Sequence, residues 1–134
     1  MTSKNSNHPH PVKLLTEVEL EIMNVIWDSN PCTVREVHEA LSQKRTVAYT
    51  SVATIMKILE QKDIVASEKQ DKAHVFQPKL ARTTYETMSL GHLAKEVFRG
   101  DSSMMVARLL DDSELNDEEL KAIRKILDRK LRGT

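Results

Sequence analysis

The sequence contains few of the residues that several common protein classes require. Its single cysteine, Cys32, excludes an internal disulfide and a zinc site built from cysteines. With 3 glycines and 4 prolines among 134 residues, the chain has too few turn residues for a loop-rich all-β protein. Aromatic residues make up only 4%, so a core would be mainly aliphatic. No apolar run approaches the roughly 18 residues of a membrane span, and residues 1–13 lack the apolar segment of a signal peptide. These absences favour a mostly helical protein of the cytoplasm.

Catalytic and metal-binding motifs are absent from the sequence as well. It shows no glycine-rich phosphate loop, no helical His-Glu metal pair and no nucleophile motif, and Cys32 has no evident basic partner. The "HPHP" stretch lies in a polar segment, residues 1–13, that we expect to be disordered and to bind no specific metal. We therefore expect no enzyme activity, no cofactor and no metal, and no small-molecule ligand is evident.

Charged residues are unevenly distributed, although the formal net charge is zero. Between Lys44 and Arg82 the chain carries eight basic and four acidic residues, a net charge of +4. Much of the balancing acid lies in "DDSELNDEE" from Asp111. The distribution of charge, rather than its sum, determines which partners a surface attracts. A zero net charge alone argues only weakly against nucleic acid, so a basic centre between acidic ends needs a physical explanation.

Two capping boxes, "TEVE" at Thr16 and "TVRE" at Thr33, mark the starts of helices in the first part of the chain. Apolar residues then recur at helical spacing, and Pro31 separates the two helices. Trp27 is expected to anchor the core, and His38 to be a surface or partly packed residue. A third helix follows, so that the predicted helices span about 16–28, 33–41 and 49–62.

Two short β-prone pieces follow the third helix. Ile64-Val65 and Val75-Phe76 flank polar "EKQDKA", which predicts a β-hairpin closed by Pro78. Three short helices and a hairpin are the order of a winged helix-turn-helix, in which the helix before the hairpin enters the DNA major groove. The basic hairpin tip would approach the DNA backbone, with a solvated turn as the alternative. Its residues are Lys69, Lys72 and His74.

One face of the predicted third helix carries hydrogen-bonding side chains and almost no carboxylates. Short hydroxyls donate to and accept from phosphates and base edges, whereas a carboxylate would face phosphate charge. We therefore expect this face to contact DNA. Its residues are Tyr49, Thr50, Ser51, Thr54 and Lys57. Capping of the helix start is the alternative explanation for one or two of the hydroxyls.

The chain beyond Thr83 is predicted to be helical, with a third capping box at Asn116. Its apolar stripes cannot form a core by themselves, and an exposed apolar face of this length needs another chain to cover it. A two-fold homodimer is the commonest arrangement, and it would present two recognition helices to two half-sites. The residues expected at the dimer interface are Leu93, Val97, Val106, Leu109, Leu110, Leu120, Ile123 and Leu127.

Three runs of the sequence are together similar to one known family. They read "LTEVELEIMNVIWDSNPCTVREVHEAL", "YTSVATIMKILEQKDIV" and "HVFQP", and a helical tail follows from "RGDSSMMVARLL". From Leu15 to Leu131 the chain resembles the penicillinase-repressor (BlaI/MecI/CopY) family of bacterial transcriptional regulators. The resemblance implies a winged-helix repressor that binds inverted-repeat operators as a dimer. It places Thr50, Ser51, Ala53 and Thr54 at base edges, Tyr49 and Lys57 at the backbone, and Lys69, Lys72 and His74 on the wing.

The chain departs from the pattern of this family at several positions. Ala53 stands where a longer side chain is common, and Asp63 stands where glycine is common. Arg108-Leu109 replaces the Asn-Phe bond at which some members are cleaved, so the resemblance does not extend to that cleavage or to a role in β-lactam resistance. The tail also lacks the cysteine-rich motif of the copper-responsive members, which excludes copper sensing by that route.

We thus predict a mainly α-helical protein with a winged helix-turn-helix and a helical tail. The expected parts are a disordered segment over 1–13, a DNA-binding domain over 14–82 and a dimerisation region over 83–134. The predicted function is a sequence-specific repressor that binds a palindromic operator in double-stranded DNA as a homodimer. The alternative is a winged-helix module that binds a protein. DNA affinity would fall steeply with salt, whereas an apolar protein contact would not.

Overall fold

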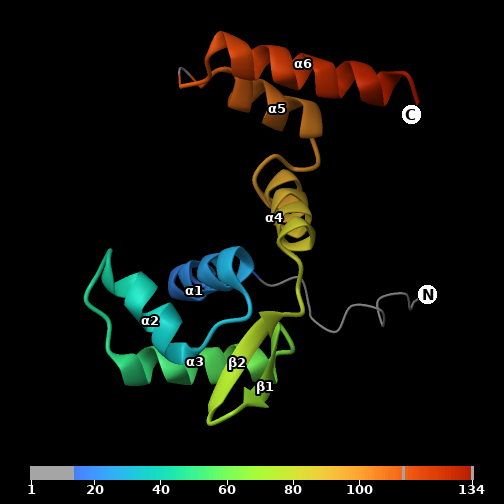
Figure 1. Ribbon diagram of the computed structural model, residues 1–134. Helices are drawn as coiled ribbons and strands as arrows, with labels where there is room; N and C mark the ends of the chain where they lie inside the picture. Colours follow the sequence, from blue (N-terminus) through green and yellow to red (C-terminus); the bar gives the residue numbers. More distant parts are fainter. Residues whose placement is uncertain (1–13, 113, 134) are drawn as a thin grey trace, which may run out of the picture. The chain divides into compact units, whose positions relative to one another are not determined.

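The computed structural model describes residues 14–112 and 114–133 of the chain (Figure 1). The expected disorder of residues 1–13, and the question of a metal at the histidines there, lie outside the described residues. Contacts divide the chain into two units, with the division between Ser89 and Leu90. This division falls inside one helix, α4 (Arg82–Glu96), whereas the boundary expected at 82/83 falls at the start of that helix.

The first unit is built on three helices, α1 (Glu17–Ser29), α2 (Val34–Ser42) and α3 (Tyr49–Gln61). Both predicted capping boxes are confirmed. The Thr16 hydroxyl accepts from the backbone N–H of Glu19, and the Thr33 hydroxyl accepts from that of Glu36. In each box the glutamate also accepts from the backbone N–H of the threonine, so two exposed donors at each helix start are satisfied.

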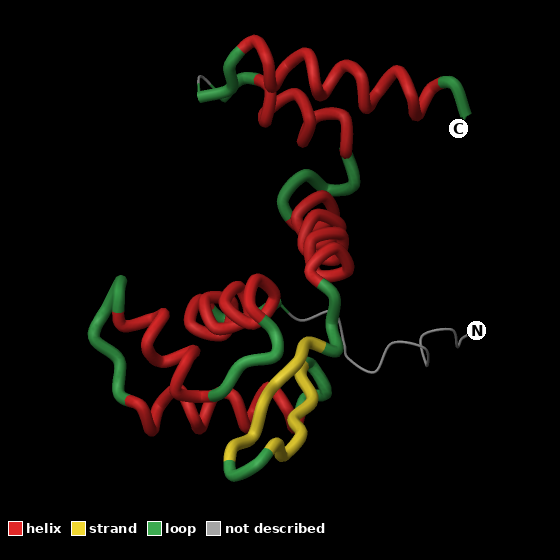
Figure 2. Tube along the Cα trace, in the orientation of Figure 1, coloured by secondary structure: helices red, strands yellow, loops and turns green. Residues whose placement is uncertain are grey.

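A two-stranded antiparallel sheet follows α3, with strands β1 (Val65–Gln70) and β2 (Ala73–Pro78), shown in yellow in Figure 2. The predicted hairpin is confirmed, but its strands are longer than the two apolar pieces. Most of the polar segment between those pieces pairs in the ladder, and only Asp71 and Lys72 form the turn. Backbone hydrogen bonds extend the strands there without any apolar side chain. Cys32 adds an isolated bridge to Phe76, which ties the start of α2 to β2.

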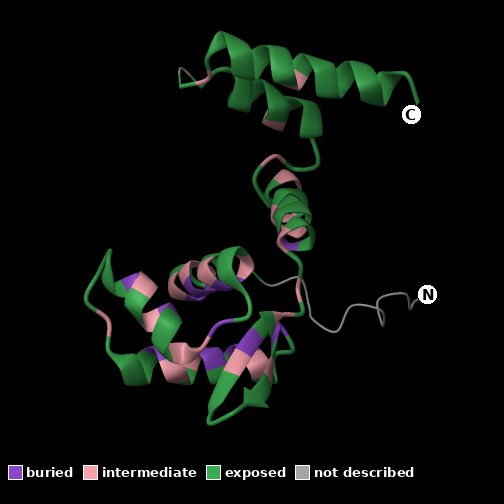
Figure 3. Cartoon of the chain, viewed as in Figure 1, coloured by how far each residue is buried: buried purple, intermediate pink, exposed green. Residues whose placement is uncertain are grey.

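The core of the first unit is aliphatic, as expected, and each helix contributes to it. Figure 3 shows the buried residues on the inward sides of α1, α2 and α3 and on the hairpin. Trp27 is only half-buried and packs against this core from its edge. The buried core residues are Ile22, Met23, Ile26, Cys32, Val37, Leu41, Val52, Met56, Leu59, Ile64, Val65 and Phe76.

The turn from α3 into β1 passes through Asp63, the position where a glycine is common in the resembling family. Its φ of 68° lies in the left-handed region, which aspartate tolerates better than most residues other than glycine. A Lys79–Asp63 ion pair of 2.6 Å lies at the same turn. The substitution therefore leaves the turn into the hairpin intact.

The second unit comprises the end of α4 together with α5 (Ser102–Leu110) and α6 (Asp117–Leu131). The third capping box is confirmed, because Asn116 and Glu119 exchange side-chain-to-backbone hydrogen bonds. No residue of α5 or α6 is buried. Among the described helices, none is both long enough and apolar enough to cross a membrane.

Candidate nucleic-acid interface

The polar face of α3 lies at the surface of the first unit. The opposite face of the helix is fully buried through Val52, Met56 and Leu59. The N-cap position is occupied by Ala48, which supplies no side-chain hydrogen bond. Capping therefore does not explain the hydroxyls, which make no hydrogen bond to any described residue. Ala53 is half-buried, and the exposed residues of this face are Tyr49, Thr50, Ser51, Thr54 and Lys57.

Ion pairs neutralise half of the basic residues between Lys44 and Arg82. Arg45 pairs with Glu21 at 2.8 Å and Lys62 with Glu19 at 3.2 Å, both on α1. Lys79 pairs with Asp63 at 2.6 Å and Arg82 with Asp28 at 2.8 Å. Lys44, Lys57, Lys69 and Lys72 have no ion pair with any residue that the structure describes. The positive charge that remains available lies in the turn before α3, on α3 and on the hairpin.

The hairpin tip carries the three basic residues that the sequence placed there. Lys69 and His74 are directly opposite in the ladder, so their side chains leave the same face of the hairpin. Lys72 lies in the turn next to Asp71, whose φ is 55°. All three basic side chains are exposed.

A hollow of about 530 Å³ joins the hairpin tip to the starts of α2 and α3. Tyr49, Lys72 and His74 were predicted from the sequence, and the hollow brings them together. Arg35 was missed, because it is an ordinary exposed residue of α2 and only the fold places it beside the hairpin. Its contact with Glu39 is a 3.9 Å pair between two well-exposed side chains. The full lining is Thr33, Val34, Arg35, Tyr49, Lys72, Ala73 and His74.

The chemistry of this hollow suits an anion. Arg35 and Lys72 supply positive charge, and the N-terminus of α2 adds the positive end of a helix dipole. His38 packs against Tyr49, with the two rings edge-on and their centres 5.6 Å apart. The Nε2 atom of His38 lies 2.8 Å from the Val47 carbonyl oxygen. The partly packed role expected for His38 is confirmed.

The single cysteine of the chain, Cys32, is buried in the first unit. Burial, with a smaller effect of Glu36, raises the pKa of the Cys32 thiol to about 11, so the thiol stays protonated and unreactive. No three His, Cys, Asp or Glu residues in the described part of the chain are grouped to hold a metal ion.

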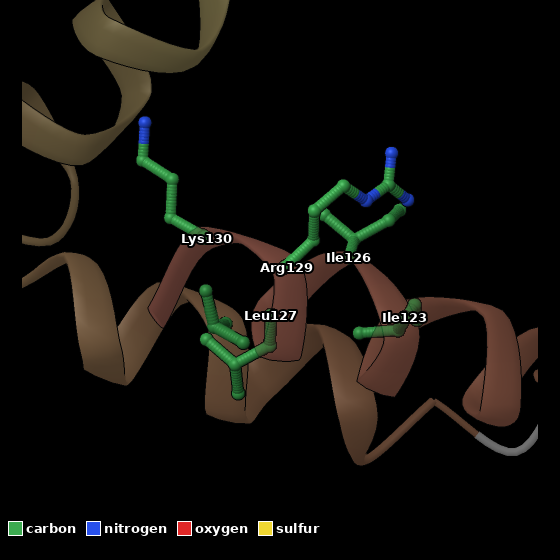
Figure 4. A pocket seen from close by; sticks show the side chains of 6 residues that line it. Ile123, Ile126, Leu127, Arg129 and Lys130 are labelled. Carbon is green, nitrogen blue, oxygen red and sulfur yellow. The ribbon is translucent and has the colours of Figure 1, made fainter. Parts of the chain in front are cut away.

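The second unit presents an apolar groove of about 430 Å³ between α5 and α6 (Figure 4). Its lining combines Val106, Ile123 and Leu127, which were expected at a dimer interface, with Ile126, which was not. Arg129 and Lys130 border it. The expected interface residues other than Ile123, which is half-buried, are all exposed: Leu93, Val97, Val106, Leu109, Leu110, Leu120 and Leu127.

Comparison with known proteins shows the family of this chain. The family model described as Penicillinase repressor matches residues 15–129. The chain belongs to the penicillinase repressor family. The resemblance inferred from its sequence runs is thereby confirmed, and so is the expectation that it is no enzyme, since the members are repressors.

Two relatives with established names are transcriptional regulators. Transcriptional regulator BlaI of Mycobacterium tuberculosis is 42% identical over 65 residues, 48% of this chain and 47% of that protein. In that alignment the chain spans about half the length of its relative. The Penicillinase repressor of Bacillus licheniformis is 25% identical over 114 residues, 85% of this chain and 89% of that protein.

A solved structure supports the fold of the first unit. The solution structure of the DNA binding domain of the repressor BlaI superposes with a TM-score of 0.50 at 25% identity. The match covers 56% of this chain and 92% of that domain. The predicted winged helix-turn-helix is therefore confirmed.

Proposed function

We propose that the protein is a transcriptional repressor that binds an operator in double-stranded DNA through α3. The observation that carries this proposal is the exposed face of α3, where uncapped hydroxyls lie beside Lys57 and no carboxylate is present. Short hydroxyls at the N-terminal end of a recognition helix reach base edges in the major groove. Thr50, Ser51 and Thr54, with Ala53 between them, would contact bases, and Lys57 would contact the backbone.

The hollow beside α3 provides the accompanying contacts to phosphate. Arg35, Tyr49, Lys72 and His74 line it from three separate elements, so a DNA strand passing there would be held from three sides. Lys69 stands next to His74 on the hairpin and extends the same positive surface. Such contacts fix the position of a protein on DNA and contribute affinity that depends on salt.

The second unit serves, in this proposal, to join two copies of the chain. Its apolar groove and the exposed leucines and valines of α4, α5 and α6 match the surface that a two-fold partner would cover. Two joined copies present two α3 helices, which suits an inverted-repeat operator. The winged-helix part would bind DNA, the helical tail would form the dimer, and the protein would act in the cytoplasm with the genes it controls.

Selection of bound fragments from a random duplex DNA library tests this function. At moderate salt, the purified protein is expected to enrich an inverted repeat whose half-sites lie about one helical turn apart. Its affinity for that repeat should fall steeply as the salt concentration rises. If folded, dimeric protein enriches no sequence, the repressor proposal fails. The winged helix would then be a module that binds a protein.

A further inference from the structure

The segment that connects β2 to α4 is held at both of its ends. The backbone N–H groups of Lys79 and Leu80 both donate to the Ile64 carbonyl oxygen, at 2.8 and 3.1 Å. Ile64 follows directly on α3, so the segment is tied to the end of the recognition helix. The Leu80 carbonyl oxygen accepts from Trp27 Nε1 at 2.8 Å, which ties the same segment to α1.

The first turns of α4 pack on the same tryptophan. The Arg82 guanidinium carbon lies 5.2 Å from the centre of the Trp27 ring, and its Nη2 lies 2.8 Å from Asp28 Oδ1. The Tyr85 ring lies 5.9 Å from the Trp27 ring, and its hydroxyl oxygen accepts from the Leu15 backbone N–H at 3.0 Å. We call Trp27, Leu80, Arg82 and Tyr85 the Trp27 clasp.

The Trp27 clasp differs from an ordinary core contact in two ways. It lies at the edge of the core, and it combines three kinds of interaction. Trp27 is only half-buried, yet it donates a hydrogen bond to a backbone carbonyl oxygen and contacts a guanidinium group and a second aromatic ring. The acceptor comes from Leu80, just before α4, and the cation and the ring come from the first turn of α4. Trp27 and Leu80 also pack against the buried core of the first unit, and Tyr85 is itself buried. These contacts fix how α4 begins on the first unit.

We propose that the Trp27 clasp is a positioning device that sets the spacing of the operator half-sites. The first turns of α4, up to Ser89, belong to the first unit, so the clasp fixes the direction in which the chain leaves that unit. Each base pair added between half-sites rotates one of them by about 34° around the DNA. A stiff junction cannot follow that rotation, whereas a loose junction can. This inference rests on the proposed function.

Operators with altered spacers test the role of the clasp. The selected inverted repeat is made with one or two base pairs added or removed at its centre, and a single half-site serves as reference. The first variant combines Trp27→Phe, which removes the indole donor, with Arg82→Ala. The second is Tyr85→Phe, which removes only the hydroxyl. The matched control is Arg45→Ala, which removes an arginine paired at 2.8 Å to another α1 carboxylate, Glu21.

The wild type is expected to lose at least about tenfold in affinity when one base pair is added, since simultaneous binding is then hindered. The double variant should lose less than about threefold, and Tyr85→Phe an intermediate amount. Affinity for the half-site should stay within about twofold of the wild type, because the DNA-contacting residues are untouched. The Arg45→Ala control should keep the wild-type dependence on spacer length.

Distances between spin labels in the two copies provide a second measurement. Glu68→Cys places a label on an exposed strand position, while the native Cys32 is only 3% exposed and resists labelling. The clasp variants should broaden the distance distribution, and an unchanged width would overturn the inference. Folded, dimeric variants that keep the wild-type spacer dependence would overturn it as well and leave the proposed function standing. If the wild type binds the inverted repeat no better than a half-site, both fail.

Discussion

The two units of this chain differ in how far their apolar residues are buried. In the first unit Ile26 is fully buried, whereas in the second unit Ile126 is 60% exposed. Both residues lie on amphipathic helices with a capping box. The same amphipathic helical pattern is thus covered by the rest of the chain in the first unit, whereas its apolar face stays exposed in the second unit. The proposed dimer would cover this exposed apolar face.

The surfaces that the two units leave open also differ in their chemistry. Four basic residues of the first unit pair with carboxylates at 3.2 Å or less, and the unit leaves a polar face on α3 and the hairpin. The second unit leaves leucine, isoleucine and valine. A hydroxyl-rich, basic surface suits a hydrated polyanion. An aliphatic groove suits another aliphatic surface. Under the proposed function these two surfaces would bind different partners, DNA on the first unit and a second copy of the chain on the second.

The largest effect is expected from placing carboxylates on the polar face. Thr50→Glu combined with Ser51→Glu should lower operator affinity by about 100-fold or more, because like charges brought together cost several kcal/mol. Dimerisation should be unaffected. The matched control is Thr83→Glu with Thr84→Glu, two adjacent exposed threonines at the start of α4. DNA titrations followed by fluorescence anisotropy measure both, and equal losses would remove α3 as the reading surface.

A charge in the apolar groove should have the next largest effect. Leu127→Asp is expected to separate the dimer and to lower operator affinity by about 10²-fold, the lower end of the gain that linked binding provides. Ala122→Asp, an exposed position of α6 outside the groove, is the control. Sedimentation equilibrium gives the oligomeric state. A Leu127→Asp protein that remains dimeric would place the interface elsewhere.

Matched truncations of isoleucine compare the two units directly. Ile26→Ala should lower the free energy of unfolding of the first unit by about 2–5 kcal/mol, as expected for a fully buried aliphatic side chain. Ile126→Ala should leave that unfolding nearly unchanged and weaken dimerisation instead. Thermal unfolding measured over a range of protein concentrations separates the two effects. Equal destabilisation of the first unit by both changes would contradict the division between the units.

A smaller effect is expected from Glu19, which joins α1 to Lys62 at the end of α3. Burial alone would raise the pKa of Glu19, but hydrogen bonds from Thr16 and the charge of Lys62 outweigh it and hold the pKa below its ordinary value. Its stabilising effect is thus complete above the unfolded-state pKa and is lost as the pH falls through the folded-state pKa.

Glu19→Gln keeps the capping geometry and removes only the charge. Because Lys62 is about half exposed, the change should cost about 1 kcal/mol at neutral pH. The difference from the wild type should vanish in acid. Urea unfolding at several pH values measures it, and a difference that grows as the pH falls would reverse the assignment.

The smallest effect is expected from Lys72 in the hairpin turn. Lys72→Ala should weaken binding to all DNA sequences about equally and reduce the slope of log affinity against log salt by about 1. Lys121→Ala, a change of one exposed lysine on α6, should leave the slope unchanged. A change in sequence preference would show instead that the hairpin contacts bases.

Sequence patterns were sufficient where structure depends on near neighbours. The capping boxes at Thr16, Thr33 and Asn116 were predictable because each depends on residues three positions apart. The dimerisation region predicted over 83–134 includes Tyr85, yet Tyr85 packs on Trp27 in the first unit. A helical period identifies a buried face and says nothing of what covers it.

Features that depend on residues far apart in the chain could not be predicted from the sequence patterns. The full length of β1 and β2 comes from backbone pairing, which polar side chains do not reveal. The place of Arg35 in the hollow, like the ion pairs that neutralise Arg45 and Lys62, exists only because the fold brings α2, the hairpin and α1 together. The count of basic residues in the sequence therefore did not show which of them are paired with carboxylates.

Under the proposed function, the missing side-chain cap on α3 would let bound DNA complete the start of that helix. The first backbone N–H groups of a helix have no partner within it, and at α3 the residue in the capping position is Ala48. A phosphate oxygen arriving there would close the helix as a threonine closes α1 and α2. The amides of Thr50 and Ser51 would then exchange with solvent freely before binding and slowly afterwards. The operator would then supply the N-terminal cap that no side chain of the protein gives to α3.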